Sequence, residues 1–210
     1  MDCPIERLIL EKDPEIYSFI SNLDETISLI DDLVDHNINP DLAVRIAYNI
    51  NNCFRIINNR HGLYEKISDT LNVLVKALLD DIDFVPMRSS NENELHLWIK
   101  RGYRLKLAFD CLCYVDPEFD TQQNNSWILQ TQLQGLIRND CSDIISGEFE
   151  DFYQLRRNYV ALTYFNQDIY FNWKSRRDEL VEKAYSIMTN IKFSQPEDEK
   201  LKIVYENLGV

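Results

Sequence analysis

The chain has 210 residues, 45% of them hydrophobic, which is ordinary for a globular protein and enough for one substantial domain. It carries 22 basic and 35 acidic side chains, a net charge of −13 at pH 7. Nucleic acid and anionic lipid are therefore disfavoured as partners, because both would be repelled. No apolar run approaches the roughly 18 residues that a membrane span needs, so we expect no membrane insertion.

The five cysteines are odd in number and lack the spacing of a disulfide framework: Cys3, Cys53, Cys111, Cys113 and Cys141. Four of them lie in apolar helical surroundings, which predicts small buried thiols in a reducing compartment, the cytoplasm or the nucleus. Cys111 and Cys113 are two residues apart and so point to different sides of a helix. No second Cys or His pair follows, and we expect no zinc site.

Helix-start signals are clearest in the first half of the chain. Asp13-Pro14 and Asn39-Pro40 each place a capping residue before a proline at the first helical position. Apolar residues at steps of three and four follow each start, and Gly62 is suited to a left-handed position after the second helix. The helices predicted in this half are 14–34, 40–57 and 63–79.

The second half is predicted with shorter helices and more loops. Asn91 and Glu94 form a capping pair, Asp116-Pro117 ends the helix that follows it, and Ser194-x-x-Glu197 is a second capping pattern with Pro196 in its first turn. The predicted loops are 87–93 and 120–125. The predicted helices are 92–115, 127–137, a turn or short helix at 140–145, the stretch 149–173, 175–191, and a last one that runs through Leu208 to Gly209.

Nothing in the chain is typical of β-structure. No segment alternates with period two, and no Asn-Gly or Asp-Gly hairpin signal occurs. We therefore predict an all-α fold of seven or eight helices in a single domain, 1–210. Because the chain stops just after a helix, it could also be the N-terminal part of a longer protein. Two architectures remain open, an irregular helical bundle and an α-solenoid of stacked helices.

Two segments carry a resemblance to a known class of helical repeats. In ELHLWIKRGYRLKLAFDCLCYVDPEF and YQLRRNYVALTYFNQ, an apolar helix begins with basic residues and ends in a short polar turn. In this respect the chain resembles armadillo/HEAT-type helical-repeat proteins. The resemblance implies a scaffold or adaptor that binds through a concave or lateral surface, and it transfers no catalytic residue.

Catalytic and cofactor motifs are missing from the sequence. There is no phosphate-binding glycine loop, no H-E-x-x-H and no G-x-S-x-G. His36, His61 and His96 each stand alone, and none has the Glu three residues earlier that di-metal carboxylate bundles use. We therefore expect a protein that is not an enzyme and binds no metal or cofactor.

The stretch 149–173 is the strongest candidate for a docking face. It holds nine of the 24 aromatic residues, forms two apolar stripes at helical spacing, and is expected to be the central helix. Tyr, Trp and Arg dominate the energetics of interfaces. In the alternative interpretation the aromatics are core and the arginines pair with Glu148, Glu150 and Asp151. The predicted partner-binding residues are Arg156, Arg157, Tyr159, Tyr164, Tyr170 and Trp173, with Lys100, Arg101 and Arg104 as a second patch.

Together these features predict a non-enzymatic intracellular protein–protein interaction module, such as a scaffold, an adaptor or a complex subunit. Its partner would be a protein with an acidic or aromatic segment, and homo-oligomerisation is left open. The alternatives are a helical regulator of a small GTPase or chaperone, a nucleic-acid binder, and an enzyme built from scattered residues.

Overall fold

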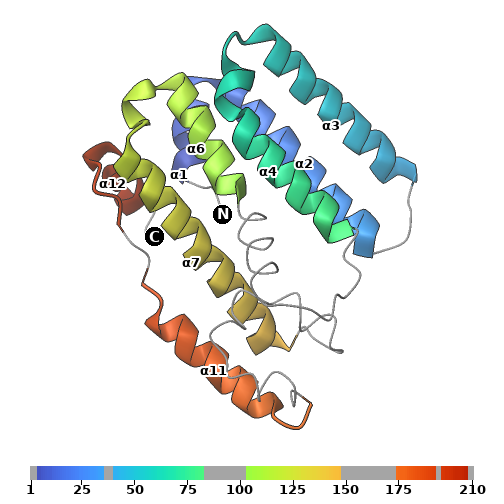
Figure 1. The fold of residues 1–210 in the computed structure, drawn as a ribbon, viewed down its shortest axis with the longest axis vertical. Coiled ribbons are helices and arrows are strands. Elements are labelled where there is room, and N and C mark those ends of the chain that lie inside the picture. Colours follow the sequence, from blue (N-terminus) through green and yellow to red (C-terminus); the bar gives the residue numbers. More distant parts are fainter. Residues whose placement is uncertain (1–3, 36–39, 83–102, 148–173, 193–194, 208–210) are drawn as a thin grey trace. The chain divides into compact units, whose positions relative to one another are not determined.

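The computed structural model describes residues 4–35, 40–82, 103–147, 174–192 and 195–207, and every regular element in these ranges is helical (Figure 1). The prediction of an all-α fold is confirmed. The described elements are α1 (Pro4–Lys12), α2 (Pro14–Asp35), α3 (Pro40–Asn59), α4 (Leu63–Ile82), α6 (Tyr103–Val115), the 3₁₀ turn η1 (Pro117–Phe119), α7 (Gln122–Ser146), α11 (Arg177–Asn190) and α12 (Glu199–Asn207).

Contacts within the chain divide it into two compact units. Unit 1 comprises 1–72, 104–126 and 196–210, and unit 2 comprises 73–103 and 127–195. In unit 1, α2 packs against α1 and α3, and α1 also packs against α12. The expectation of a single domain, like the choice between bundle and solenoid, stays a prediction.

The first three predicted helix starts are confirmed. The Asp13 carboxylate accepts hydrogen bonds from the backbone N–H of Glu15 (3.1 Å) and Ile16 (3.3 Å), which caps α2 as the Asp-Pro pattern predicts. Gly62 lies between α3 and α4 with φ +80°, a conformation that L-residues rarely adopt. The chain can therefore reverse within three residues after α3.

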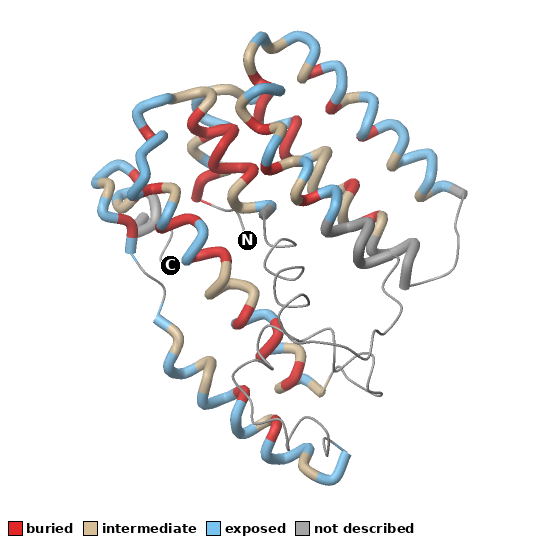
Figure 2. The backbone as a smooth tube through the Cα atoms, viewed as in Figure 1, coloured by how far each residue is buried: buried red, intermediate tan, exposed pale blue. Residues whose placement is uncertain are grey.

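Helix α6 is the most completely buried element of unit 1. All seven residues from Leu107 to Cys113 are buried (Figure 2). One of them is charged: the Asp110 carboxylate accepts a 2.6 Å hydrogen bond from the Thr70 hydroxyl and pairs with Lys106. A helix buried on all sides is a core element, and the sequence analysis assigned that place to the stretch 149–173, which lies outside the described residues.

Helix α7 corrects two predictions. Residues 122–125, predicted as part of a loop, form its first turn, and 140–145 continue it without a break. The Thr121 hydroxyl caps it by accepting from the N–H of Asn124 (3.1 Å), and the Asn124 side chain donates to the Phe119 carbonyl (3.0 Å). The polar run 120–125 is therefore a capped helix start, because its side chains bond to the backbone groups that a loop would leave to water.

Helix α12 begins later than the Ser194 capping pattern predicts. Its first residue is Glu199, and the Asp198 carboxylate caps it by accepting from the N–H of Lys200 (2.9 Å) and Leu201 (3.1 Å). Asp198 directly precedes the helix and is a preferred capping residue type, whereas Ser194 lies outside the described residues.

A short acidic turn, residues 116–120 and called the η1 corner below, joins α6 to α7. Its carboxylates meet lysines from three helices: Lys12 of α1 donates to Asp116 (2.8 Å), Lys66 of α4 to Asp120, and Lys200 of α12 to Glu118. Phe119 is buried among them, and the Lys200 ammonium lies 5.8 Å from the centre of its ring. The corner therefore links α1, the start of α4 and α12 to the turn between α6 and α7.

Unit 2 has a separate core between two helices. Ile137, Cys141 and Ile144 of α7 are buried with Leu180 and Ala184 of α11, at the three- and four-residue spacings that place them on facing sides. The prediction of helix 175–191 is thus confirmed as α11. The predicted loop 87–93, the first part of helix 92–115 and the helix 149–173 lie outside the described residues.

Candidate functional site

The strongest candidate for a functional site is the side of α3 that points away from α2. Pro40 stands at the first helical position, where its missing N–H costs nothing, and Asp41 places a negative charge in the first turn. Asn49, Cys53 and Ile56 are buried at steps of four and three, so this stripe is the inner side of α3. The Cys53 thiol donates to the Phe19 carbonyl of α2 at 3.7 Å.

The opposite side of α3 exposes an unusual amount of apolar surface. Val44, Tyr48 and Phe54 are 69%, 65% and 60% exposed, and Ile50 is 39% exposed. Of the ten large apolar side chains that are exposed among the described residues, four lie on this helix. We call this surface the α3 outer face; its residues are Asp41, Ala43, Val44, Ala47, Tyr48, Ile50, Asn51, Phe54 and Arg55.

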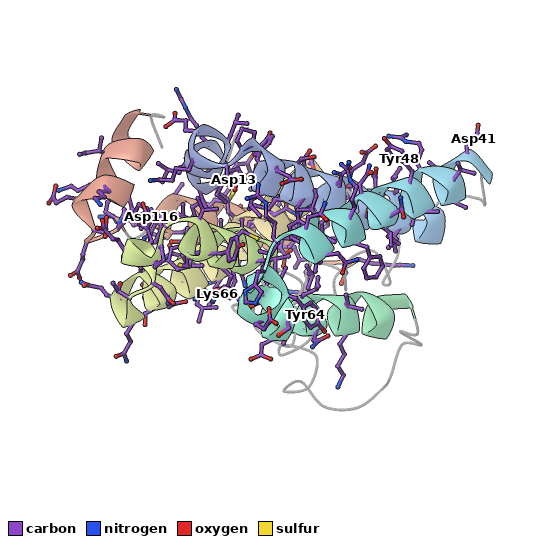
Figure 3. All side chains as sticks on the ribbon, turned by 90° about the horizontal axis from the view of Figure 1, so that it is seen from above. Asp13, Asp41, Tyr48, Tyr64, Lys66 and Asp116 are labelled. Carbon is purple, nitrogen blue, oxygen red and sulfur yellow. The ribbon has the colours of Figure 1, made fainter. Side chains whose placement is uncertain are left out.

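An ion pair braces α3 on α2 beside this face. Arg45 pairs with Glu25, and the Asn49 amide donates to the other Glu25 oxygen at 3.1 Å. These hydrogen bonds, first from Arg45 and then from Asn49, lower the pKa of Glu25 and keep the carboxylate charged. These contacts attach to α2 the part of α3 that carries Tyr48, which is labelled in Figure 3. A helix held in place under exposed aromatic residues has less entropy to lose when it binds a partner.

Of the residues that the sequence analysis singled out, Arg104 is the one that the structure describes. The Arg104 guanidinium forms an ion pair with the Asp24 carboxylate of α2 through two contacts, each 2.7 Å. Arg156, Arg157, Tyr159, Tyr164, Tyr170, Trp173, Lys100 and Arg101 lie outside the described residues, and their role stays a prediction. Arg104 contributes to holding α6 on α2, and its role in partner binding stays a prediction.

Most cations of unit 1 are engaged in the same way as Arg104. The guanidinium of Arg60 lies 3.0 Å from the Asp13 carboxylate and 2.7 Å from that of Glu15. Lys12, Lys66 and Lys200 meet the carboxylates of the η1 corner. Basic side chains that already face carboxylates offer little to a phosphate backbone, and this agrees with the acidic net charge.

The described cysteines are buried free thiols, as predicted. Burial raises the pKa of Cys53 and Cys141 to about 11 and that of Cys113 to about 12, and it also raises the pKa of Cys111. Thiols with raised pKa values are poor nucleophiles, because the thiolate is the reactive form. In the described part of the chain, no group of three or more His, Cys, Asp or Glu side chains is placed to hold a metal ion.

Comparison with protein-family models, curated proteins and solved structures finds no match to this chain. The resemblance to armadillo/HEAT-type repeats therefore stays a prediction. Among the described residues, no helix is both long enough and apolar enough to span a membrane.

Sequence reasoning missed the α3 outer face because α3 carries apolar residues on more than one side. Ile50 and Phe54 lie about 60° and about 100° around the helix from the buried Cys53, and the structure exposes them. The signal was present in Val44 and Tyr48, which are four residues apart and lie on a different side of the helix from Cys53. A helix with apolar residues beyond one face needs either a second neighbour or a partner.

Proposed function

We propose that this chain is a non-enzymatic protein–protein interaction module, acting as a scaffold, an adaptor or a subunit of a complex, and that the α3 outer face is its binding surface. The observation that carries the proposal is the exposure of Val44, Tyr48 and Phe54 on one braced helix. An exposed apolar patch on a folded domain marks a site of association, and tyrosine, phenylalanine and arginine are typical residues of such sites.

The chemistry of the face favours protein over the other ligand classes. Its apolar centre suits burial against another apolar surface, whereas nucleic acid would need unengaged cations. The free buried thiols support a reducing compartment, the cytoplasm or the nucleus. The stretch 149–173 remains a second proposed face, for an acidic or aromatic segment.

Site-specific photo-crosslinking tests this function directly. A photoreactive phenylalanine analogue would replace Tyr48 in one variant and Tyr64 in another, because Tyr64 is also exposed but lies on α4. We expect covalent protein adducts from position 48 in the source-cell lysate, and their loss when Phe54→Glu is added on the same face. Equal yields from the two positions, or none from position 48, would contradict the proposal.

A further inference from the structure

Helix α7 is buried on different sides in its two halves. Successive residues of an α-helix lie about 100° apart around its axis, and at this spacing the two sets of buried residues centre roughly 160° apart. The buried residues of the first half are Asn124, Trp127, Ile128, Thr131 and Gln132, and those of the second half are Ile137, Asp140, Cys141 and Ile144. The helix therefore packs on nearly opposite sides before and after its middle.

The change of side falls on residues 133–136. None of these four residues is buried, although Leu133 and Leu136 pack against the edge of the core that α7 shares with α11. Gly135 lies among them, and α7 stays helical through it (Figure 1). The middle of α7 is therefore its least anchored stretch, and helices open most easily where few side chains are buried.

Neither the backbone nor the packing requires a glycine at position 135. Among the described residues, the glycines with positive φ are Gly62 and Gly147. A methyl group added to Gly135 would meet no atom within 4 Å beyond the backbone of its own helix and its two chain neighbours, so alanine would fit. Glycine instead lowers the equilibrium constant for local helix formation about fivefold relative to alanine. Gly135 therefore makes the middle of α7 easier to bend.

A buried hydroxyl adds to the weakness of this part of α7. Thr131, one turn before Gly135, is 9% exposed, and of the buried side-chain oxygens and nitrogens that the structure describes, its hydroxyl has no hydrogen-bond partner. Such a group has lost its hydration without compensation, which costs free energy. A bend at 133–136 would let water reach the Thr131 hydroxyl and would lower this cost.

The second half of α7 is joined firmly to α11. Their shared core contains side chains of both helices that are completely buried, among them Cys141 and Leu180. At its other end, α11 stops at Asn190, and the backbone is extended at Ile191. The two helices therefore have the contacts to move together, and extended backbone follows α11.

We propose that residues 133–136 are a hinge in α7, and that the second half of α7 moves with α11 as a two-helix arm. The hinge is a conformational device that goes beyond the proposed function, and it does not depend on the α3 outer face. A few residues, often small ones, absorb the change of backbone angles in hinges of this kind. Because burial is low only between the two packed stretches, the arm bends without breaking either of them.

Distances between pairs of spin labels test the hinge. The nitroxides would be attached to genetically encoded keto amino acids, so that the native thiols stay unchanged. One pair spans the hinge, with labels at the exposed positions of Gln130 on α7 and Glu182 on α11. The other pair lies inside the arm, with labels at the exposed positions of Ser142 and Glu182. Double electron–electron resonance should give a broader distance distribution for the first pair than for the second.

Removal of the glycine should stiffen the hinge. Gly135→Ala should narrow the 130/182 distribution to about the width of the 142/182 distribution, and it should slow hydrogen exchange of the amides 136–139 about fivefold. Asn139→Ala is the matched control, because it raises helix propensity by a similar amount at an exposed position beyond the hinge. This control should leave the 130/182 distribution as broad as in the wild type. Circular dichroism of each variant confirms folding.

Three outcomes would overturn the inference. Equal widths for the two pairs in the wild type would show that α7 does not bend at 133–136. A 130/182 distribution that stays equally broad in Gly135→Ala would show that the glycine is not the source of the motion. A broad 142/182 distribution would show that the second half of α7 and α11 do not move together. None of these results bears on photo-crosslinking from position 48, so the proposed function is tested separately.

Discussion

The η1 corner and the α3 outer face lie in the same unit but differ in whether their side chains are engaged within the chain or exposed. In the corner, each of three carboxylates meets a lysine of the same chain, and the aromatic ring is buried. On the outer face, the aromatic rings are exposed and Arg55 points to solvent. The charged side chains of the corner pair with one another and hold the fold together. The aromatic side chains of the face are exposed, and another molecule can bind them.

The same substitution in the two regions should give the largest contrast. Phe119→Ala removes a fully buried ring and should lower the free energy of unfolding by about 3 to 5 kcal/mol. Phe54→Ala removes an exposed ring and should change it by less than about 1 kcal/mol in the monomer. Urea unfolding followed by circular dichroism at low protein concentration measures both.

The contrast between the η1 corner and the α3 outer face would be wrong if Phe119→Ala and Phe54→Ala lowered the free energy of unfolding equally. A loss of several kcal/mol for Phe54→Ala in a monomeric sample would mean that its ring is buried in solution and that the α3 outer face is part of a core. A loss for Phe119→Ala below about 1 kcal/mol would mean that the corner does not hold the fold.

A pair of arginines provides a smaller contrast. Arg60 pairs with Asp13 and Glu15 and links the end of α3 to the start of α2, so Arg60→Ala should cost about 1 kcal/mol. Arg55→Ala, five residues earlier, should stay within about 0.5 kcal/mol at dilutions where the chain is monomeric. Equal losses from chemical denaturation would show that Arg55 is also paired within its own chain.

The smallest predicted effect is a loss of the stability that the η1 corner contributes when the pH is lowered. Hydrogen bonds from Lys12 and Lys66 lower the pKa of Asp116 and Asp120 below the ordinary value of 3.8. Groups with a lowered pKa stabilise the fold above their ordinary value, and the stabilisation is lost as the pH falls through the folded-state pKa. The stability gap between the wild type and the Asp116→Asn/Asp120→Asn variant should therefore shrink as the pH falls below about 4.

Urea midpoints measured between about pH 7 and about pH 3 follow this gap. Asparagine at position 116 can still accept the hydrogen bond that the Glu118 N–H donates to this side chain, so the variant isolates the charge. A gap that keeps its width at low pH would show that the lysine pairs contribute nothing measurable.

Local signals predicted most of the described helices. Asp13-Pro14, Asn39-Pro40 and Gly62 act within one turn of their own position, so their effects can be read without knowing the rest of the fold. The start of α7 could not be read in this way, because the polar run 120–125 contains its own cap, and Thr121 resembles a loop residue until Asn124 bonds back to it.

The candidate site was harder to predict than the helices. Periodicity shows that α3 has apolar residues on several sides, but which side is covered depends on where α2 lies. Only the structure places Cys53 against α2 and leaves Phe54 exposed, although the two are neighbours in the sequence. The predicted patch at 156–173 lies outside the described residues and stays a prediction.

The buried thiols can report the transient local opening of the helices that carry them. At neutral pH a thiol with a pKa near 11 is almost wholly protonated and shielded, so an alkylating reagent reaches it only when the surrounding helix detaches transiently. Cys53 reports on α3, Cys111 and Cys113 on α6, and Cys141 on α7. Because Cys53 lies behind the α3 outer face, occupation of that face should slow its alkylation, so mass spectrometry could register binding without an added label.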